Sequence, residues 1–143
     1  RRAATVLKSH PVTTRIARDL PMVRVDPVLF EQVLFNLLDN AAKYAPDGSQ
    51  VMIEGYGDAR EVVVRVLDRG PGIPEEERAR VFDKFYRIRK GDSVRAGTGL
   101  GLAICRGFVE AMGGTITLSG RYDGPGAVFT VRLPAAPRPE ALP

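Results

Sequence analysis

Cysteine, histidine and long apolar runs are scarce in this chain of 143 residues, and each scarcity excludes something. The single cysteine, Cys105, rules out an internal disulfide, and its place on the apolar face of an expected helix favours a packed thiol over a reactive one. No apolar run approaches the ~20 residues of a membrane-spanning helix, and no signal peptide opens the chain. We therefore expect one domain of cytosolic character, long enough for a substantial core.

The apolar patterns predict an α/β domain with two layers. Strand-like runs occur at residues 12–16, 22–25, 51–56, 62–67, 115–118 and 127–133. Helical patterns occur at residues 27–44, 75–82 and 100–112, the last ended by two glycines. Short turns at residues 60–61 and 123–126 join neighbouring strands as hairpins. Successive hairpins indicate a mostly antiparallel sheet with the helices on one face.

The most informative segment is the helix expected at residues 27–44. Asp26 supplies an N-cap, and Pro27 supplies a first-turn proline. Four polar side chains share one face of this helix, at positions i, i+4, i+7 and i+8: Asn36, Asn40, Lys43 and Tyr44. Burying unpaired amides costs on the order of a few kcal/mol each, so we expect a polar ligand to meet this face.

A glycine-rich loop follows the strand-like run at residues 62–67. Asp68 lies at the end of that run, and Gly70 and Gly72 come directly after it. A backbone of this kind can pass close to a flat ligand, and Asp68 could then accept a hydrogen bond from an exocyclic amine. An aspartate-initiated turn without a ligand is the alternative interpretation of this loop alone.

A second glycine-rich segment, at residues 97–102, runs straight into an apolar helix. Glycines before a helix N-terminus expose backbone N–H groups and the positive end of the helix dipole, which together favour an anion. No Gly-Lys-Ser/Thr sequence follows, so the segment is not a P-loop. The preceding residues, 90–96, are loop-like rather than strand-like, which argues against a dinucleotide-binding fingerprint.

In this order and spacing, the segments resemble the catalytic ATP-binding domain of bacterial sensor histidine kinases. Four motifs of that family occur in sequence: the N box at residues 36–44, the first glycine box at 68–73, the F box at 81–87 and the second glycine box at 97–102. The resemblance extends over residues 12–134. The sequence of residues 103–114 is most similar to that of potassium-responsive kinases of the Kdp type. The resemblance implies the GHKL-type fold, shared with gyrase, heat-shock chaperone and mismatch-repair ATPases: a mixed sheet layered against three helices.

The resemblance also implies ATP and Mg²⁺ as cofactors. Mg²⁺ prefers oxygen ligands and keeps several waters, so the amide oxygen of Asn40 would suffice as a metal ligand. Lys43 would neutralise phosphate charge and Tyr44 would pack near the purine. Asp68 would accept a hydrogen bond from the adenine amine, and the glycines after it would let the ring approach the backbone. Thr130 would support Asp68 through a water.

Further residues of the implied site come from the F box and the second glycine box. Arg87 and Thr98 are expected at the phosphate end, Arg87 together with Asn36 and Lys43 as catalytic residues. The remaining expected ligand contacts follow from the two glycine boxes: Gly70, Gly72, Ile73, Gly99, Leu100, Gly101 and Leu102. Phe82 and Phe85 are interpreted as lid anchors, with core packing as the alternative.

Asn36 separates phosphoryl transfer from hydrolysis. In the hydrolysing relatives, the equivalent helix position carries a glutamate that acts as general base, and an amide has no useful basicity. Transfer to a protein side chain is therefore favoured. Two alternatives stay open: a serine-protein kinase of the anti-sigma type on the same scaffold, and a degenerate kinase module that senses nucleotide without catalysis.

The sole histidine, His10, is not expected to accept the phosphoryl group. The family's acceptor is followed by an acidic residue on a long dimerising helix, whereas His10 is followed by Pro11, which disfavours helix at the preceding position. We interpret His10 as a solvated linker residue. Residues 1–11 are expected to be a linker from a preceding helical domain, residues 12–134 the catalytic domain, and residues 135–143 a disordered tail.

The expected partners are therefore the histidine-bearing dimerisation domain of the same parent chain and a response regulator downstream. The net charge of +4 and the pI near 9.6 do not indicate nucleic acid, because acidic residues are interspersed and no basic-and-aromatic stripe recurs. The dense basic run at residues 78–95 is better explained by a lid over a triphosphate. We expect a cytoplasmic domain of a membrane-anchored sensor kinase, without direct membrane contact of its own.

Overall fold

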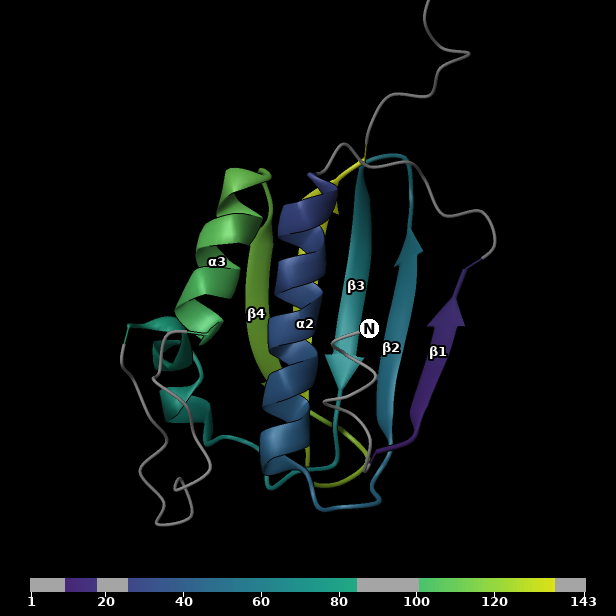
Figure 1. The fold of residues 1–143 in the computed structure, drawn as a ribbon, viewed down its shortest axis with the longest axis vertical. Helices are drawn as coiled ribbons and strands as arrows, with labels where there is room; N and C mark the ends of the chain where they lie inside the picture. Colours follow the sequence, from purple (N-terminus) through teal and green to yellow (C-terminus); the bar gives the residue numbers. More distant parts are fainter. Residues whose placement is uncertain (1–9, 18–25, 85–100, 136–143) are drawn as a thin grey trace, which may run out of the picture.

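The computed structural model describes residues 10–17, 26–84 and 101–135, and within these ranges five strands form one sheet (Figure 1). Their order across the sheet is β1-β2-β3-β5-β4. The strands are β1 (Val12–Ile16), β2 (Val51–Gly57), β3 (Glu61–Leu67), β4 (Thr115–Gly120) and β5 (Ala127–Pro134). β1 runs parallel to β2, and the other three pairings are antiparallel. The expected mixed, mostly antiparallel sheet is confirmed.

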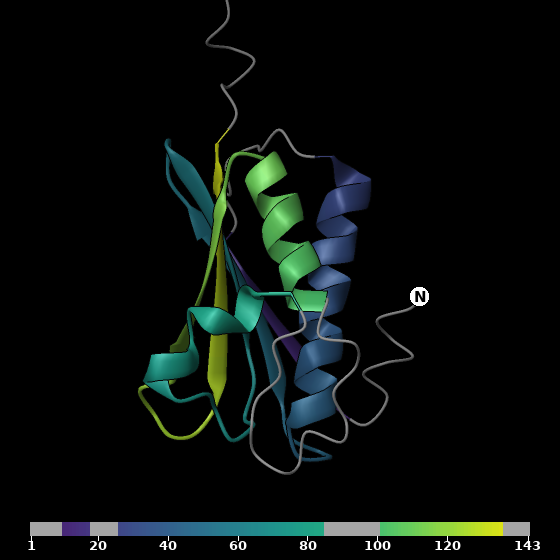
Figure 2. The ribbon, with the colours of Figure 1, turned by 90° about the vertical axis from the view of Figure 1, so that its left-hand side faces the viewer.

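Two α-helices cover one face of this sheet, α2 (Pro27–Tyr44) and α3 (Gly101–Ala111). Figure 2 shows the helices and the sheet as two layers seen edge-on. The described ranges contain no helix long and apolar enough to cross a membrane. The strand predicted at residues 22–25 lies outside the described residues, as does Phe85.

The prediction of a third helix at residues 75–82 is wrong. The segment forms two separate 3-10 turns, η1 (Glu75–Glu77) and η2 (Arg80–Phe82). Eight residues can close only a few α-helical hydrogen bonds against the cost of nucleation, so packing decides the local form. Here the anchor is Phe82, which is 4% exposed and meets Phe129 edge-on, with ring centroids 6.1 Å apart. Core packing, the alternative interpretation of Phe82, therefore describes its contacts.

The bounds of α2 follow from its caps. The Asp26 carboxylate accepts from the backbone N–H groups of Val28 at 2.9 Å and Leu29 at 3.4 Å, which satisfies donors that the first turn leaves open. The buried face of the helix comprises Val33, Leu37, Leu38 and Ala41. This face packs against the sheet and against α3. This packing fixes the rotation of α2 about its own axis, and with it the directions of its polar side chains.

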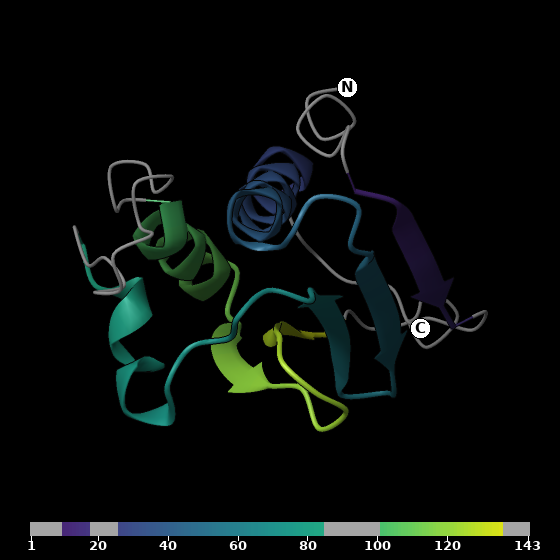
Figure 3. The ribbon, with the colours of Figure 1, turned by 90° about the horizontal axis from the view of Figure 1, so that it is seen from below.

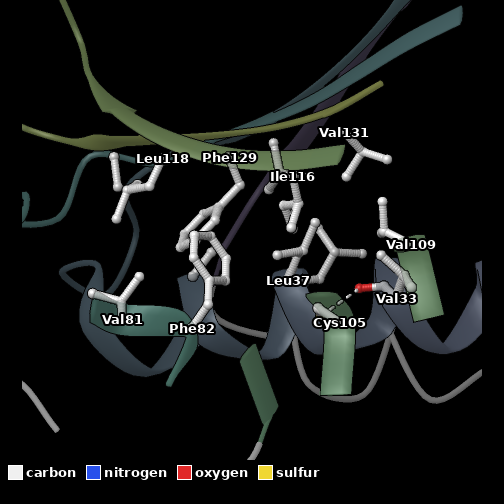
Figure 4. Close-up of a cluster of buried hydrophobic side chains, with 14 of the residues drawn as sticks. Val33, Leu37, Val81, Phe82, Cys105, Val109, Ile116, Leu118, Phe129 and Val131 are labelled. Carbon is white, nitrogen blue, oxygen red and sulfur yellow. Dashed lines mark hydrogen bonds between the residues drawn. The ribbon is translucent and has the colours of Figure 1, made fainter. Parts of the chain in front are cut away.

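Cys105 lies in the core between the two helices (Figure 4). Its side chain is fully buried, and its Sγ lies 3.6 Å from the main-chain oxygen of Val33. Burial raises the pKa of the thiol to about 12, so it stays protonated at neutral pH. The expectation of a packed, unreactive thiol agrees with this environment.

Candidate nucleotide-binding site

A cavity of about 580 Å³ is lined by residues of α2, of the loop after β3 and of the β4–β5 turn. Figure 3 views the end of the molecule at which α2 and β3 end and the β4–β5 turn lies. Three segments build the cavity: the last turn of α2, the loop after β3, and the β4–β5 turn. The lining residues are Asn40, Tyr44, Asp68, Gly70, Pro71, Gly72, Ile73, Pro74, Arg78, Gly120, Arg121, Gly124, Pro125, Gly126 and Ala127. A concave space of this size, mostly apolar with a few polar groups, suits a small-molecule ligand.

Asp68 provides the buried carboxylate of the cavity, with 4% of its surface exposed. Its Oδ1 accepts two backbone hydrogen bonds, from Gly70 N at 2.8 Å and from Ala127 N at 3.2 Å. Among the residues that the structure describes, both of these bonds end on Oδ1, and Oδ2 is the oxygen left for a ligand donor. Burial raises the pKa of Asp68, and the two backbone bonds oppose this, with smaller contributions from the charges of Arg121 and His10.

Two glycines let the backbone close around Asp68. A Cβ on Gly70 would lie 3.2 Å from Asp68 Oδ1 and equally close to the main-chain oxygen of Tyr44, so this loop rests against the end of α2. Gly126 has a φ of +148°, and a Cβ there would come within 2.2 Å of the main-chain oxygen of Asp68. A Cβ at Gly126 would displace the main chain of Asp68, and a Cβ at Gly70 would press on its carboxylate and on the end of α2.

The polar face predicted on α2 divides into two groups. Asn40 and Tyr44 line the cavity, as do Asp68, Gly70, Gly72 and Ile73 from the first glycine box. Lys43 instead pairs with Asp39, one helical turn earlier, at 3.2 Å. Asn36 points to the other helix and donates from Nδ2 to the main-chain oxygen of Gly101 at 3.3 Å. The structure thus brings only part of the stripe to the cavity.

The second glycine box lies mostly outside the described residues. Three of its predicted ligand contacts, Thr98, Gly99 and Leu100, are not among the described residues, and neither is Arg87 of the F box. Gly101 is the first residue of α3, and Leu102 is partly buried against the core. Within the described residues, neither of these two lines the cavity. Their role as ligand contacts stays a prediction.

Thr130 does not support Asp68 in the way expected. It pairs with Arg65 on β3 and Thr117 on β4, in the middle of the sheet. Side chains alternate along a strand, so Thr130 faces away from the core side on which Phe129 and Val131 lie. The support for Asp68 comes instead from backbone N–H groups and from Arg121.

The interpretation of His10 as a solvated residue is wrong. Its side chain is 5% exposed, and Nδ1 lies 3.1 Å from the main-chain oxygen of Ser49. The next residue explains why, because the main-chain oxygen of Pro11 accepts from Val51 N at 2.9 Å and draws the segment against β2. The positive charge that His10 can carry lowers the pKa of Asp68, so the two lie within electrostatic reach.

Sequence reasoning missed three charged residues beside the cavity: Arg69, Arg121 and Asp123. Asp123 pairs with Arg69 and with Arg121, each at 3.0 Å. Positions 69 and 123 lie 54 residues apart, and single arginines and aspartates in turns are common. No local pattern joins them, so only the pairing of β5 with β3 reveals the cluster. The described residues hold no group of three His, Cys, Asp or Glu side chains placed for a metal ion.

A family model described as histidine kinase-, DNA gyrase B- and HSP90-like ATPase matches residues 25–137. The sensor protein KdpD of Escherichia coli (strain K12) is 43% identical over 132 residues, which are 92% of this chain and 14% of that protein. The adaptive-response sensory kinase SasA of a Nostoc species is 40% identical over 131 residues, 91% of this chain and 32% of that protein. The chain therefore spans less than a third of these two curated relatives.

Solved structures of sensor histidine kinases have a fold similar to that of this chain. The mycobacterial sensor histidine kinase MprB matches with a TM-score of 0.84 and 31% identity, over 96% of this chain and 91% of that chain. Full-length ShkA, solved in complex with AMPPNP, matches with a TM-score of 0.77 and 31% identity, over 96% of this chain and 27% of that chain.

Proposed function

Because this chain belongs to the family of histidine kinase-, DNA gyrase B- and HSP90-like ATPases, we propose that it binds Mg-ATP in the cavity beside Asp68. We further propose that it donates the γ-phosphoryl group to a histidine on another domain of its parent chain. The observation that carries the proposal is the buried carboxylate of Asp68, anchored through Oδ1 with Oδ2 left for a ligand. A carboxylate oxygen in a largely apolar cavity selects a ligand that presents an N–H donor, as adenine does.

The cavity fits a purine. Gly70 keeps the wall beside Asp68 open, because a side chain there would press on the carboxylate and on the end of α2. Ile73 and Pro71 offer apolar surface to the ring, and Tyr44 offers an aromatic one. Residues 12–134 are the proposed extent of the catalytic domain.

The phosphate end of the ligand is assigned to α2 and to the glycine-rich segment before α3. Asn40, which lines the cavity, is the proposed ligand of Mg²⁺ through its amide oxygen. When bound, the ion would neutralise charge on the phosphates. Lys43 is the proposed cation for the same end. Its pairing with Asp39 is half-exposed and therefore weak enough to exchange for a phosphate. Arg87, Thr98, Gly99 and Leu100 remain proposed contacts at this end.

Transfer rather than hydrolysis is proposed because of Asn36. Its amide already accepts from Gln32 Nε2 at 2.9 Å and donates to the main-chain oxygen of Gly101, and it has no basicity with which to activate water. The proposed partners are thus the histidine-bearing dimerisation domain and, after it, a response regulator. We place the domain in the cytoplasmic part of a sensor kinase of the Kdp type.

Incubation with radiolabelled ATP tests this function. The domain alone is expected to bind Mg-ATP but to leave itself unlabelled and to release little phosphate, because it holds the donor without a nucleophile. Adding the parent's histidine-bearing domain as a separate protein should produce acid-labile label on that domain, at a rate limited by encounter because the covalent tether is absent. Steady phosphate release from the domain alone would contradict transfer, and label on His10 would contradict the assignment of the acceptor to another domain.

A further inference from the structure

Asp123, in the β4–β5 turn, lies between two guanidinium groups at the edge of the cavity. Arg69 donates to it through Nη1 and Nη2 at 3.2 and 3.0 Å. Arg121 donates through Nε and Nη2 at 3.0 and 3.4 Å. The two arginines, Arg121 first, hold the pKa of Asp123 well below its ordinary value. These bidentate pairs join the loop after β3 to the β4–β5 turn.

Arg121 is the inner member of this cluster. Its side chain is 10% exposed, whereas the side chains of Arg69 and Asp123 are each 41% exposed. Its Nη1 donates to the main-chain oxygen of Asp68 at 3.4 Å. The turn can lie this close because Gly126 has no side chain, and a Cβ there would come within 2.4 Å of Arg121 Cδ. Arg121 is therefore packed against the backbone of the residue that carries the buried carboxylate.

We propose that Arg121 is a positioning residue that holds Asp68 in the orientation and the charged state needed to accept the adenine amine. The inference rests on the proposed function, because it assumes that Asp68 meets adenine. Asp123 holds the guanidinium in turn, through Nε and Nη2, so that it keeps facing Asp68. The charges of the four groups balance, since two guanidinium groups oppose two carboxylates. Arg121 uses Nε, Nη1 and Nη2 in these contacts.

The electrostatics of Asp68 agree with this role. Burial raises the pKa of this carboxyl, and Arg121 is the charged group that opposes it most strongly. The other charged group that acts on Asp68 is His10, from the segment before β1. Removing Arg121 should therefore protonate Asp68 at a higher pH. A protonated carboxyl offers a donor where the adenine amine also offers one, so ATP binding should fail earlier on acidification.

Arg121→Gln and Arg69→Gln form a matched pair for the test. Both remove one positive charge and one partner of Asp123, but of the two side chains described, only that of Arg121 donates a hydrogen bond to Asp68. His10 is present in both variants, so its own contribution is common to them. ATP affinity would be measured by calorimetry from about pH 5 to about pH 8. Circular dichroism would confirm that each variant is folded.

Arg121→Gln should lose about tenfold or more in ATP affinity at neutral pH, with the acid limb of its profile moved to higher pH. Arg69→Gln should lose less than about threefold and keep the wild-type profile. Arg121→Lys restores the charge without the paired contacts, so it should return the profile to the wild-type pH but recover the affinity only in part. If Arg121→Gln does not fold, the affinity of Arg121→Lys carries the comparison, because it should stay below that of Arg69→Gln while both keep the wild-type profile.

Equal profiles for the Arg121 and Arg69 variants would overturn the inference while leaving the proposed function intact. The proposed function itself fails by a different result, namely a wild-type protein that binds ATP and GTP equally well. If the wild type prefers ATP over GTP but the pH profile of Arg121→Gln is not shifted, the role of Arg121 is rejected and the proposed function stands.

Discussion

The side-chain amide of Asn36 on α2 donates from Nδ2 to the main-chain oxygen of Gly101, the first residue of α3, over 3.3 Å. Its Oδ1 accepts from Gln32 Nε2 at 2.9 Å. The residue proposed to favour transfer over hydrolysis is thus also a polar link between the two helices, at the point where α3 begins. The start of α3 is the end of the second glycine box, so this bond joins two of the family's motifs.

Asn36→Ala is expected to lower the free energy of unfolding by about 1 kcal/mol, because it removes the hydrogen bonds with Gln32 and Gly101. Asn36→Asp should cost more, since it keeps the acceptor for Gln32 but sets a carboxylate against the main-chain oxygen of Gly101. Urea unfolding of the three proteins measures the order. An aspartate variant as stable as the wild type would mean that the contact between Asn36 and Gly101 contributes nothing in solution.

Phe82 offers a second stability test, because it was interpreted as a lid anchor and lies in the core (Figure 4). Phe82→Ala should destabilise the domain by about 3–5 kcal/mol, through lost burial and the cavity left against Phe129. Phe82→Leu is the matched control, and it should cost less than about half of that. Thermal unfolding followed by circular dichroism gives both values. An alanine variant with an unchanged melting temperature would return Phe82 to a role in the lid alone.

The regular elements could be predicted from the sequence because their signals are local. Asp26 and Pro27 mark the start of α2, and the helix indeed runs from residue 27 to residue 44. Asp68 directly follows β3, as its place after an apolar run indicated. Within the part of the chain that the structure describes, the exception is the segment at residues 75–82, where the helical pattern is too short to outweigh packing around Phe82.

The rest of the site depends on contacts between distant segments. Lys43 lies on α2, as the helical pattern predicts, but Asp39, four residues earlier, pairs with its charge, and its phosphate contact stays a prediction. His10 is buried because the strand pairing draws its segment against β2, and Pro11 gave no sign of that. Arg121 reaches Asp68 only across the β4–β5 turn. For His10 and Arg121 the partner comes from a segment that is distant in the sequence, which spacing along the chain does not encode, whereas Lys43 and Asp39 are neighbours on one helix.

The proposed metal ligand can be tested by comparing two conditions. Asn40→Ala should weaken ATP binding strongly in Mg²⁺ and little in EDTA, because it deletes a ligand of the ion and leaves the purine contacts in place. Calorimetry with ATP in both buffers measures the two losses. Tyr44→Ala is a useful comparison, since a purine contact should lose affinity equally in the two buffers. Equal losses for Asn40→Ala would make that residue structural and place the metal elsewhere.

Asp68→Asn should abolish ATP binding and leave the domain folded. The amide oxygen can still accept from Gly70 N and Ala127 N, but the amide nitrogen would face the adenine amine, so that two donors meet at a cost of ~1–3 kcal/mol or more. Guanine presents a carbonyl where adenine presents an amine, so the wild type should reject GTP. Calorimetry with both nucleotides decides this. A wild-type protein with equal affinity for them would remove Asp68 from the proposed role.

The same substitution has an expected signature in the pH dependence of unfolding. Burial raises the pKa of Asp68 above its value in the unfolded chain, so the folded state holds this proton more tightly. Ionisation of Asp68 therefore costs stability as the pH rises through the interval between the unfolded and the folded pKa, and the cost persists above it. Asp68→Asn removes this cost. The difference in unfolding free energy between variant and wild type should thus move in favour of the variant as the pH rises above about 4. Urea unfolding at several pH values measures it, and a difference that stays constant with pH would mean that the raised pKa is absent from the folded protein.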